Sequence, residues 1–301
     1  MSIGGQKVFC PDKMAASFVR RRIKWIGRVG MTSTEFSYNR FAANAWYQAL
    51  NVHLVELAQV KPGQKVVDLA CGPGSVTKII LEKVRDAKNS VVIGIDMSSS
   101  ALKQAREDLS NASNTLVEFA EGRAEDLTRL VRDKVDTVVF CNAIHLVEDK
   151  SQVMREVSDT LRSGGIFAFN SSFFKGDLTD ETSQFYRRWM MRSLRILKND
   201  FGLKPSKEKV MARQALSIAE YTEILEGNGF QVSTTEIEPV EVPLEGWQDI
   251  SYFEDFIAGA LPGVPLKEAS HSLVEAAAQI FSEFELSSVR RDWLSIVAVR
   301  Q

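Results

Sequence analysis

The sequence has little of three things that mark particular classes of protein: cysteine, surplus charge and long apolar runs. Its three cysteines, Cys10, Cys71 and Cys141, lack the paired spacing of a metal site, so no metal is expected. Three is also an odd number, and no secretory segment is evident, which favours free thiols in a reducing compartment. The location expected from these features is the cytoplasm.

Charge and hydropathy argue against two kinds of partner. The formal net charge of -2 and the isoelectric point near 6.0 argue against a general nucleic-acid-binding surface. No apolar run approaches the length that spans a bilayer, so no integral membrane segment is expected. The content of 45% hydrophobic and 25% charged residues is that of a globular protein with a sizeable core.

One stretch organises the rest of the chain and reads V-V-D-L-A-C-G-P-G-S-V-T, from Val66 to Thr77. An apolar run, two glycines and a pattern of helical period follow one another, which predicts a strand, a loop and a helix. Because Gly72 and Gly74 have no Cβ atom, a flat ligand can lie directly against the main chain. A dinucleotide fingerprint would place a third glycine at Thr77, so phosphate binding of that kind is the weaker reading.

A second buried strand, residues 90–96, ends in Asp96, which follows Asp68 by 28 positions (96 minus 68). In a doubly wound sheet the carboxyl ends of neighbouring parallel strands face one crevice, so Asp96 can accept hydrogen bonds from both hydroxyls of a ribose. The alternative role, capping the next helix, is better served by the serines at 98–100. Met97 either lies near an adenine ring or is a core methionine.

Three further segments continue the alternation of strands and helices. A strand at 115–120 is followed by E-G-R-A-E-D-L, and a strand at 134–141 is followed by N-A-I-H-L-V-E-D. The sequence L-R-S-G-G then precedes a fifth strand at 166–169. Such an alternation predicts a parallel sheet in an α/β fold.

In their order and spacing, these segments resemble the class I S-adenosylmethionine-dependent methyltransferases over about two thirds of the chain. The resemblance implies a Rossmann-like seven-stranded sheet with helices on both faces, and S-adenosylmethionine as the cofactor. The residues that it implies bind the cofactor are Tyr38, Asp68, Ala70, Cys71, Gly72, Pro73, Gly74, Asp96, Met97, Arg123, Ala124, Glu125, Asn142 and Ala143.

The sequence departs from the family pattern in informative places. Arg123 stands where the family often has an aspartate that contacts adenine, so that contact falls to Glu125, Asp126 or water, or is absent. Leu146 replaces the second histidine of the usual N-A-L-H-H-L segment. The N-P-P-Y or D-P-P-Y sequence typical of enzymes that methylate nucleobase amines is missing here, so a nucleic-acid substrate is not expected.

His145 is the candidate catalytic residue. The resemblance implies that its segment borders the methyl group, where a neutral imidazole could take a proton from the acceptor. Alternatively, a histidine that follows an apolar strand is a hydrogen-bonded structural residue. The implied reaction is an in-line displacement, for which positioning of the reactants and exclusion of water account for most of the acceleration.

Long segments outside the core predict a helical cap formed by insertions. We expect an N-terminal helical arm or lid at 1–58, a cofactor-binding core at 59–172, a cap insertion at 173–215, and the rest of the core at 216–301 with a second insertion at about 244–286. The basic start of the chain fits a solvated helix, an arm over the site, a membrane-surface helix or a transit peptide.

The expected partner is a small, largely apolar methyl acceptor of the natural-product type, because aromatic and methionine side chains line one face of the helix predicted at 185–197. Arg187, Arg188 and the arginines near the N-terminus could bind a carboxylate or phosphate on it. Two alternatives stay open: a nicotinamide-dependent oxidoreductase, and an inactive cofactor-binding scaffold, for which Arg123 is the best support.

Overall fold

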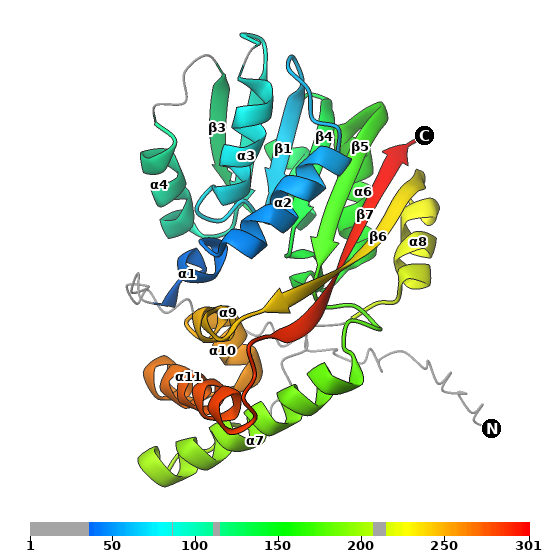
Figure 1. Cartoon of the computed structure of the whole chain (residues 1–301). Helices are drawn as coiled ribbons and strands as arrows, with labels where there is room; N and C mark the ends of the chain where they lie inside the picture. Colours follow the sequence, from blue (N-terminus) through cyan, green and yellow to red (C-terminus); the bar gives the residue numbers. More distant parts are fainter. Residues whose placement is uncertain (1–35, 86, 111–114, 207–214) are drawn as a thin grey trace, which may run out of the picture. The chain divides into compact units, whose positions relative to one another are not determined.

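Seven strands form one sheet in the computed structural model, which describes residues 36–85, 87–110, 115–206 and 215–301 (Figure 1). Across the sheet their order is β3-β2-β1-β4-β5-β7-β6. Neighbours from β3 to β5 run parallel, and β7 is antiparallel to both β5 and β6. The strands are β1 Lys65–Leu69, β2 Val91–Asp96, β3 Leu116–Glu121, β4 Val135–Cys141, β5 Leu161–Ser171, β6 Phe230–Val242 and β7 Val289–Arg300.

Helices cover both faces of this sheet. On one face α2 and α3 pack over alternate strand residues such as Val66, and on the other α6 and α8 pack over their neighbours, such as Val67. Successive strand residues point to opposite faces, which is why these central strands are apolar throughout. The helices of the core are α1 Asn39–Ala42, α2 Ala45–Leu57, α3 Ser75–Val84, α4 Ser99–Asp108, α5 Leu127–Leu130, α6 Lys150–Thr160 and α8 Ile218–Gly227.

Four further helices form the cap: α7 Asp180–Phe201, α9 Leu244–Ile250, α10 Glu254–Ala260 and α11 Leu266–Glu283. Figure 1 shows them together beyond the end of the sheet toward which β5 points. With α1 they share an aromatic core, whose buried members include Trp189, Trp247 and Phe256. The carboxyl end of a parallel sheet is where α/β folds bind their ligands, so the cap stands over the expected site.

The long helix α7 has clear start and stop signals. The side chain of Thr179 accepts a hydrogen bond from the backbone N–H of Thr182, and two acidic residues occupy the first turn. Gly202 ends the helix in the left-handed conformation, with φ of 65°. Within the helix, the Trp189 indole N–H donates to Leu273 O of α11 at 2.8 Å, which ties the two longest cap helices together.

Two strands begin earlier in the chain than their apolar runs, at 166–169 and 293–299, predict. Strand β5 starts at Leu161 because residues 162–165 form an irregularity, after which pairing with β4 resumes at Ile166. Strand β7 starts at Val289 because it pairs with β6 as far as Val242. The extension of β7 matters for the site, since it brings residues 290–292 into the sheet.

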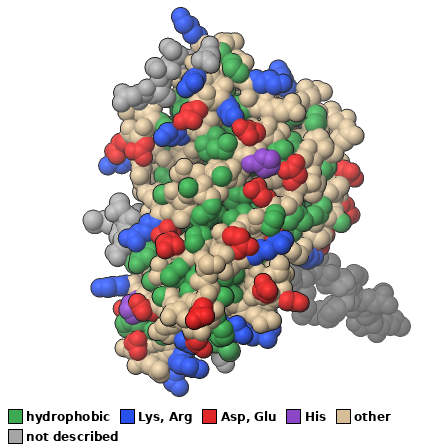
Figure 2. All heavy atoms as spheres, viewed as in Figure 1, with side chains coloured by type: hydrophobic (Ala, Val, Ile, Leu, Met, Phe, Trp, Pro, Cys, Tyr) green, Lys and Arg blue, Asp and Glu red, His purple; other side chains and the backbone are tan. Residues whose placement is uncertain are grey.

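Predictions for residues 1–35, including the basic stretch, lie outside the described residues. Among the residues that are described, none of the helices combines the length and apolar character needed to cross a membrane. Acidic and basic side chains are interspersed on the face displayed in Figure 2.

Candidate active site

The glycine loop between β1 and α3 turns sharply through left-handed backbone conformations at Ala70, Gly72 and Gly74, with φ of 56°, 53° and 91°. A Cβ atom at Gly74 would lie 3.1 Å from Ala105 Cβ, so glycine permits close packing against α4. A Cβ atom at Gly72 would meet nothing within 4 Å. The loop is therefore packed on one side and open on the other, as a binding loop must be.

Asp96 fastens this loop to the end of β2. Its Oδ2 accepts a hydrogen bond from the Gly72 backbone N–H at 2.8 Å, and its Oδ1 accepts one from the Ser98 N–H at 2.8 Å. Burial raises the pKa of this carboxyl group despite those bonds. Each carboxylate oxygen has a second lone pair, so further donors can still bind there. A role in holding the ribose stays a prediction.

Asp68 lies beneath the loop and is fully enclosed. Its Oδ2 accepts a hydrogen bond from Thr77 Oγ1 at 2.6 Å, and its Oδ1 is buried with no partner among the described residues. Burial raises the pKa of Asp68 to about 7. Thr77, which stands where a dinucleotide fingerprint has its third glycine, therefore donates a hydrogen bond to Asp68. An unpaired buried acceptor fits a ligand that carries N–H or O–H donors, as S-adenosylmethionine does.

The remaining residues of the loop, and those that follow β2 and β3, differ in their exposure. Cys71 is buried, and Pro73 is partly exposed. The Met97 side chain is 68% exposed beside Asp96. Arg123 forms an ion pair with Glu125, with 3.0 Å between Nη2 and Oε1. Glu125 is one of the acids expected to replace the aspartate of the family, and one of its two oxygens is therefore already paired. Ala124 packs against the main core.

Asn142 joins the cofactor side of the site to the region under the cap. It takes a left-handed conformation, with φ of 45°, and its backbone N–H donates to Asn170 Oδ1 at 2.7 Å. Its side-chain Nδ2 donates to the hydroxyl oxygen of Tyr38 at 2.9 Å. The Tyr38 ring in turn lies 4.9 Å from the Phe253 ring, beside the cap. Ala143, next in the chain, is buried.

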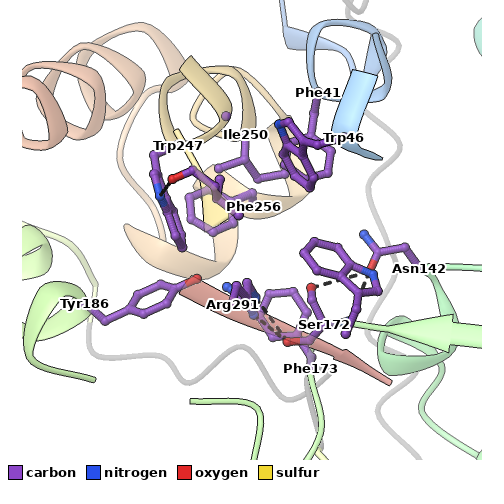
Figure 3. Close-up of a pocket in the computed structure, with 13 residues that line it drawn as sticks. Phe41, Trp46, Asn142, Ser172, Phe173, Tyr186, Trp247, Ile250, Phe256 and Arg291 are labelled. Carbon is purple, nitrogen blue, oxygen red and sulfur yellow. Dashed lines mark hydrogen bonds between the residues drawn. The ribbon is translucent and has the colours of Figure 1, made fainter. Parts of the chain in front are cut away.

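A cavity of about 30 Å³ begins at Asn142 and extends under the cap (Figure 3). Space of that size holds about two water molecules. Most of its walls are aromatic, from Phe41, Trp46, Phe173, Trp247, Phe256 and Trp293. Such walls suit a flat or apolar molecule.

Arg291 on β7 is a cavity residue that the sequence analysis missed. It is only 6% exposed, and its Nε and Nη2 atoms both donate to Ser172 O, at 3.2 and 2.6 Å. Burial lowers the pKa of its guanidinium to about 10. By contrast, Arg187 and Arg188 on α7 are exposed, and Arg188 lies over the Phe284 ring. If the strand predicted from Trp293 onward is extended toward the N-terminus, Arg291 falls two residues before Trp293 and therefore on the same face of the sheet as Trp293.

His145 is buried close to the cavity but is not among the residues that line it. Its Nδ1 lies 3.1 Å from Ser171 Oγ, and its ring packs on the Phe173 ring with 4.4 Å between centroids. Phe173 does line the cavity. A direct contact between His145 and an acceptor would therefore require Phe173 to move.

The comparisons with known proteins agree with this geometry. Residues 60–229, more than half of the chain, match the family described as a methyltransferase domain. One relative is the ubiquinone/menaquinone biosynthesis C-methyltransferase UbiE of Stenotrophomonas maltophilia, with 33% identity over 47% of this chain and 56% of that protein. Another is the trans-aconitate 2-methyltransferase of Rhodopseudomonas palustris, with 34% identity over 38% of this chain and 41% of that protein.

Among solved structures, the mycolic acid cyclopropane synthase CmaA1, complexed with SAH and CTAB, has a TM-score of 0.53 and 14% identity. The match covers 84% of this chain and 83% of that one. At this identity the likeness concerns the fold. The chain spans about half the length of the curated relatives it matches.

The order of the strands is that of the class I S-adenosylmethionine-dependent methyltransferase fold. The match to the methyltransferase family identifies S-adenosylmethionine as the cofactor. The chain belongs to the methyltransferase domain family. The predictions of family, fold class and cofactor are thereby confirmed. The individual cofactor contacts and the domain boundaries stay predictions.

Proposed function

We propose that the protein transfers a methyl group from S-adenosylmethionine to a small, largely apolar metabolite. The observation that carries this proposal is the position of Asn142, which follows β4 in the family's cofactor-side segment and also lines the aromatic cavity. A cofactor at the glycine loop and an acceptor in the cavity would therefore meet at one residue. The two relatives described above are named for different acceptors, so they do not identify one for this chain.

The cofactor, when bound, supplies a methyl group on a positively charged sulfur, which the acceptor atom displaces in line. This chain's own residues have three tasks in the proposal. Asp68, Gly72 and Asp96 hold the cofactor, the aromatic walls orient the acceptor, and the cap excludes water. We assign the removal of a proton from the acceptor to His145, reached after Phe173 turns aside. An acceptor that is already nucleophilic would not need this step.

Two measurements test the proposal. Titration calorimetry with S-adenosylmethionine and with NADH should show binding of the first alone. Incubation of the purified full chain with S-adenosylmethionine and a panel of aromatic and aliphatic metabolites should then release S-adenosylhomocysteine. Cofactor binding without any such release, across acceptors with oxygen, nitrogen and carbon nucleophiles, would favour the inactive scaffold, and NADH binding would favour the oxidoreductase.

A further inference from the structure

Three residues that line the cavity under the cap have polar groups without a hydrogen-bond partner among the described residues. The indole nitrogens of Trp46 and Trp293 and the hydroxyl of Tyr186 are buried without a hydrogen-bond partner in the described part of the chain. All three residues line the same cavity, although they come from α2, β7 and α7. An indole N–H can only donate, and a tyrosine hydroxyl can donate as well. Residues around the cavity therefore carry donors without partners in the described part of the chain.

Arg291 adds a positive charge to this set. Both of its hydrogen bonds go to one carbonyl oxygen, that of Ser172, so its Nη1 atom has no partner within the described residues. Its guanidinium also lies over the Phe173 and Tyr186 rings, 4.5 and 5.3 Å from their centroids. Figure 3 shows the Tyr186 hydroxyl pointing toward Arg291. An unoccupied donor and a charge thus lie in an aromatic cavity.

The acid that faces Arg291 neutralises it incompletely. Asp177 Oδ2 lies 3.6 Å from Nη2 of Arg291, beyond hydrogen-bond distance, and burial raises the pKa of that carboxyl group. The next acid, Asp292, is engaged by Arg290, whose Nε lies 2.8 Å from Oδ1. A buried cation with one loose counter-ion is a costly arrangement unless a further anion binds.

We propose that Arg291 recognises a carboxylate on the methyl acceptor, with the hydroxyl of Tyr186 as a further donor. This rests on the proposed function. The substrate class is then a small monoanionic acid with a flat or apolar body. A single guanidinium among aromatic walls matches one negative charge better than the two of a phosphate monoester. Because the cavity holds about 30 Å³, the acceptor enters only when cap side chains move.

A purely structural role for Arg291 would be to hold Ser172 O and Asp177 together. That role explains two of its donors, but it does not account for the Nη1 atom or for the Tyr186 hydroxyl that points toward Arg291. A carboxylate on the acceptor can accept hydrogen bonds from both groups.

The test uses the full chain saturated with S-adenosylhomocysteine and three matched pairs of probes: benzoate and benzamide, cinnamate and cinnamamide, octanoate and octanamide. Calorimetry should show at least one acid bound about tenfold more tightly than its amide, as expected for a charge-assisted contact. In Arg291→Met, and in the charge-balanced Arg291→Met/Asp177→Asn variant, this preference should disappear while binding of S-adenosylhomocysteine persists. Tyr186→Phe should reduce the preference in part.

Arg290→Met is the matched control, because Arg290 is the neighbouring arginine on the same strand and its side chain is 44% exposed. It should keep the preference of the wild type. Equal binding of acids and amides, binding of none of the six probes, or a preference that survives in Arg291→Met would overturn the proposal. If the wild type does not bind S-adenosylhomocysteine, the proposed function itself is contradicted. Failure of the carboxylate proposal and failure of the proposed function can therefore be distinguished.

Discussion

The carboxylate of Asp96 accepts a hydrogen bond from the backbone N–H of Gly72, and 2.8 Å separates the two atoms across 24 residues of sequence. The bond couples the position of the glycine loop to the end of the neighbouring strand. Parallel pairing of β1 and β2, with Leu69 opposite Ile95, sets the distance between them. The surface to which we assign the adenosyl group is therefore held in place by the protein's own hydrogen bonds.

Replacing Asp96 by alanine should weaken cofactor binding. We expect a loss of about 1.5–3 kcal/mol, the usual worth of hydrogen bonds to a charged group, because the loop anchor and the ribose contact are removed together. Calorimetry with S-adenosylhomocysteine measures it. Asp133→Ala, at an acid whose side chain is 83% exposed, is the control. Unchanged affinity in the Asp96 variant would remove the ribose assignment.

Asp68 should make the ligand-free protein less stable as pH rises. Its pKa is raised by burial to about 7 in the folded state, so between about pH 4 and 7 the folded protein holds a proton that the unfolded chain has lost. Stability from this group is full below that window and falls across it, by at most about 4 kcal/mol.

The measurement is the difference in unfolding free energy between wild type and Asp68→Asn, taken from urea titrations at several pH values from 4 to 8. Other titrating groups cancel in that difference. The wild type should lose its advantage as pH rises, and a difference that stays flat across the range would show that Asp68 does not titrate there.

His145→Ala should lower turnover by about a hundredfold or more if the imidazole acts as a base, with little change in cofactor affinity. Steady-state assays of S-adenosylhomocysteine release would show this. His53→Ala is the control, since His53 pairs with Glu236 at the surface, 2.8 Å away. Full activity in His145→Ala would mean that the base is elsewhere or unnecessary.

Gly246→Ala should narrow the cavity. A Cβ atom there would lie 2.7 Å from Val242 Cγ1 and 3.0 Å from Trp46 Cζ2. Both distances are too short, so the Trp46 ring would have to move. Overpacking of this kind costs about 1–3 kcal/mol, or about 5- to 150-fold in acceptor KM if the whole effect falls on binding. Kinetic assays of the purified variant measure it.

Gly227→Ala is the control for that substitution, because a Cβ atom at Gly227 meets nothing within 4 Å. It should leave the acceptor KM unchanged. Cofactor affinity should stay normal in both variants, since neither position touches the glycine loop. An unaltered KM in Gly246→Ala would indicate that acceptors bind outside this cavity.

The sequence was sufficient to predict the parts of the fold that depend on local patterns. The valine-rich runs that contain Asp68 and Asp96 predicted strands that the structure places side by side, because hydrophobic period and turn residues determine them directly. The conformation of the glycine loop was predictable for the same reason. Its residues lie together in the chain.

The cavity under the cap was predictable only in part. Asn142 belongs to a family segment and Tyr186 to the helix face expected to line a pocket, but the residues of the cavity are distant from one another in sequence. Arg291 illustrates the difficulty: Arg290 and Arg291 are adjacent in the chain, yet one is exposed and the other buried. Only the pairing of β7 with β6 distinguishes them, and that pairing extends further than the apolar run that begins at Trp293 indicates. Likewise, the packing of Phe173 on His145 depends on tertiary contacts alone.

The twelve-residue strand β7 pairs with β6 over its length and with β5 from Leu294 to Val299. A shift of β7 by one residue would break both ladders, so Arg291 cannot drift out of place through changes in the adjoining loops. The helices of the cap are not paired in this way. Substitutions in the cap could therefore change which acceptor fits while the position of Arg291 stays the same.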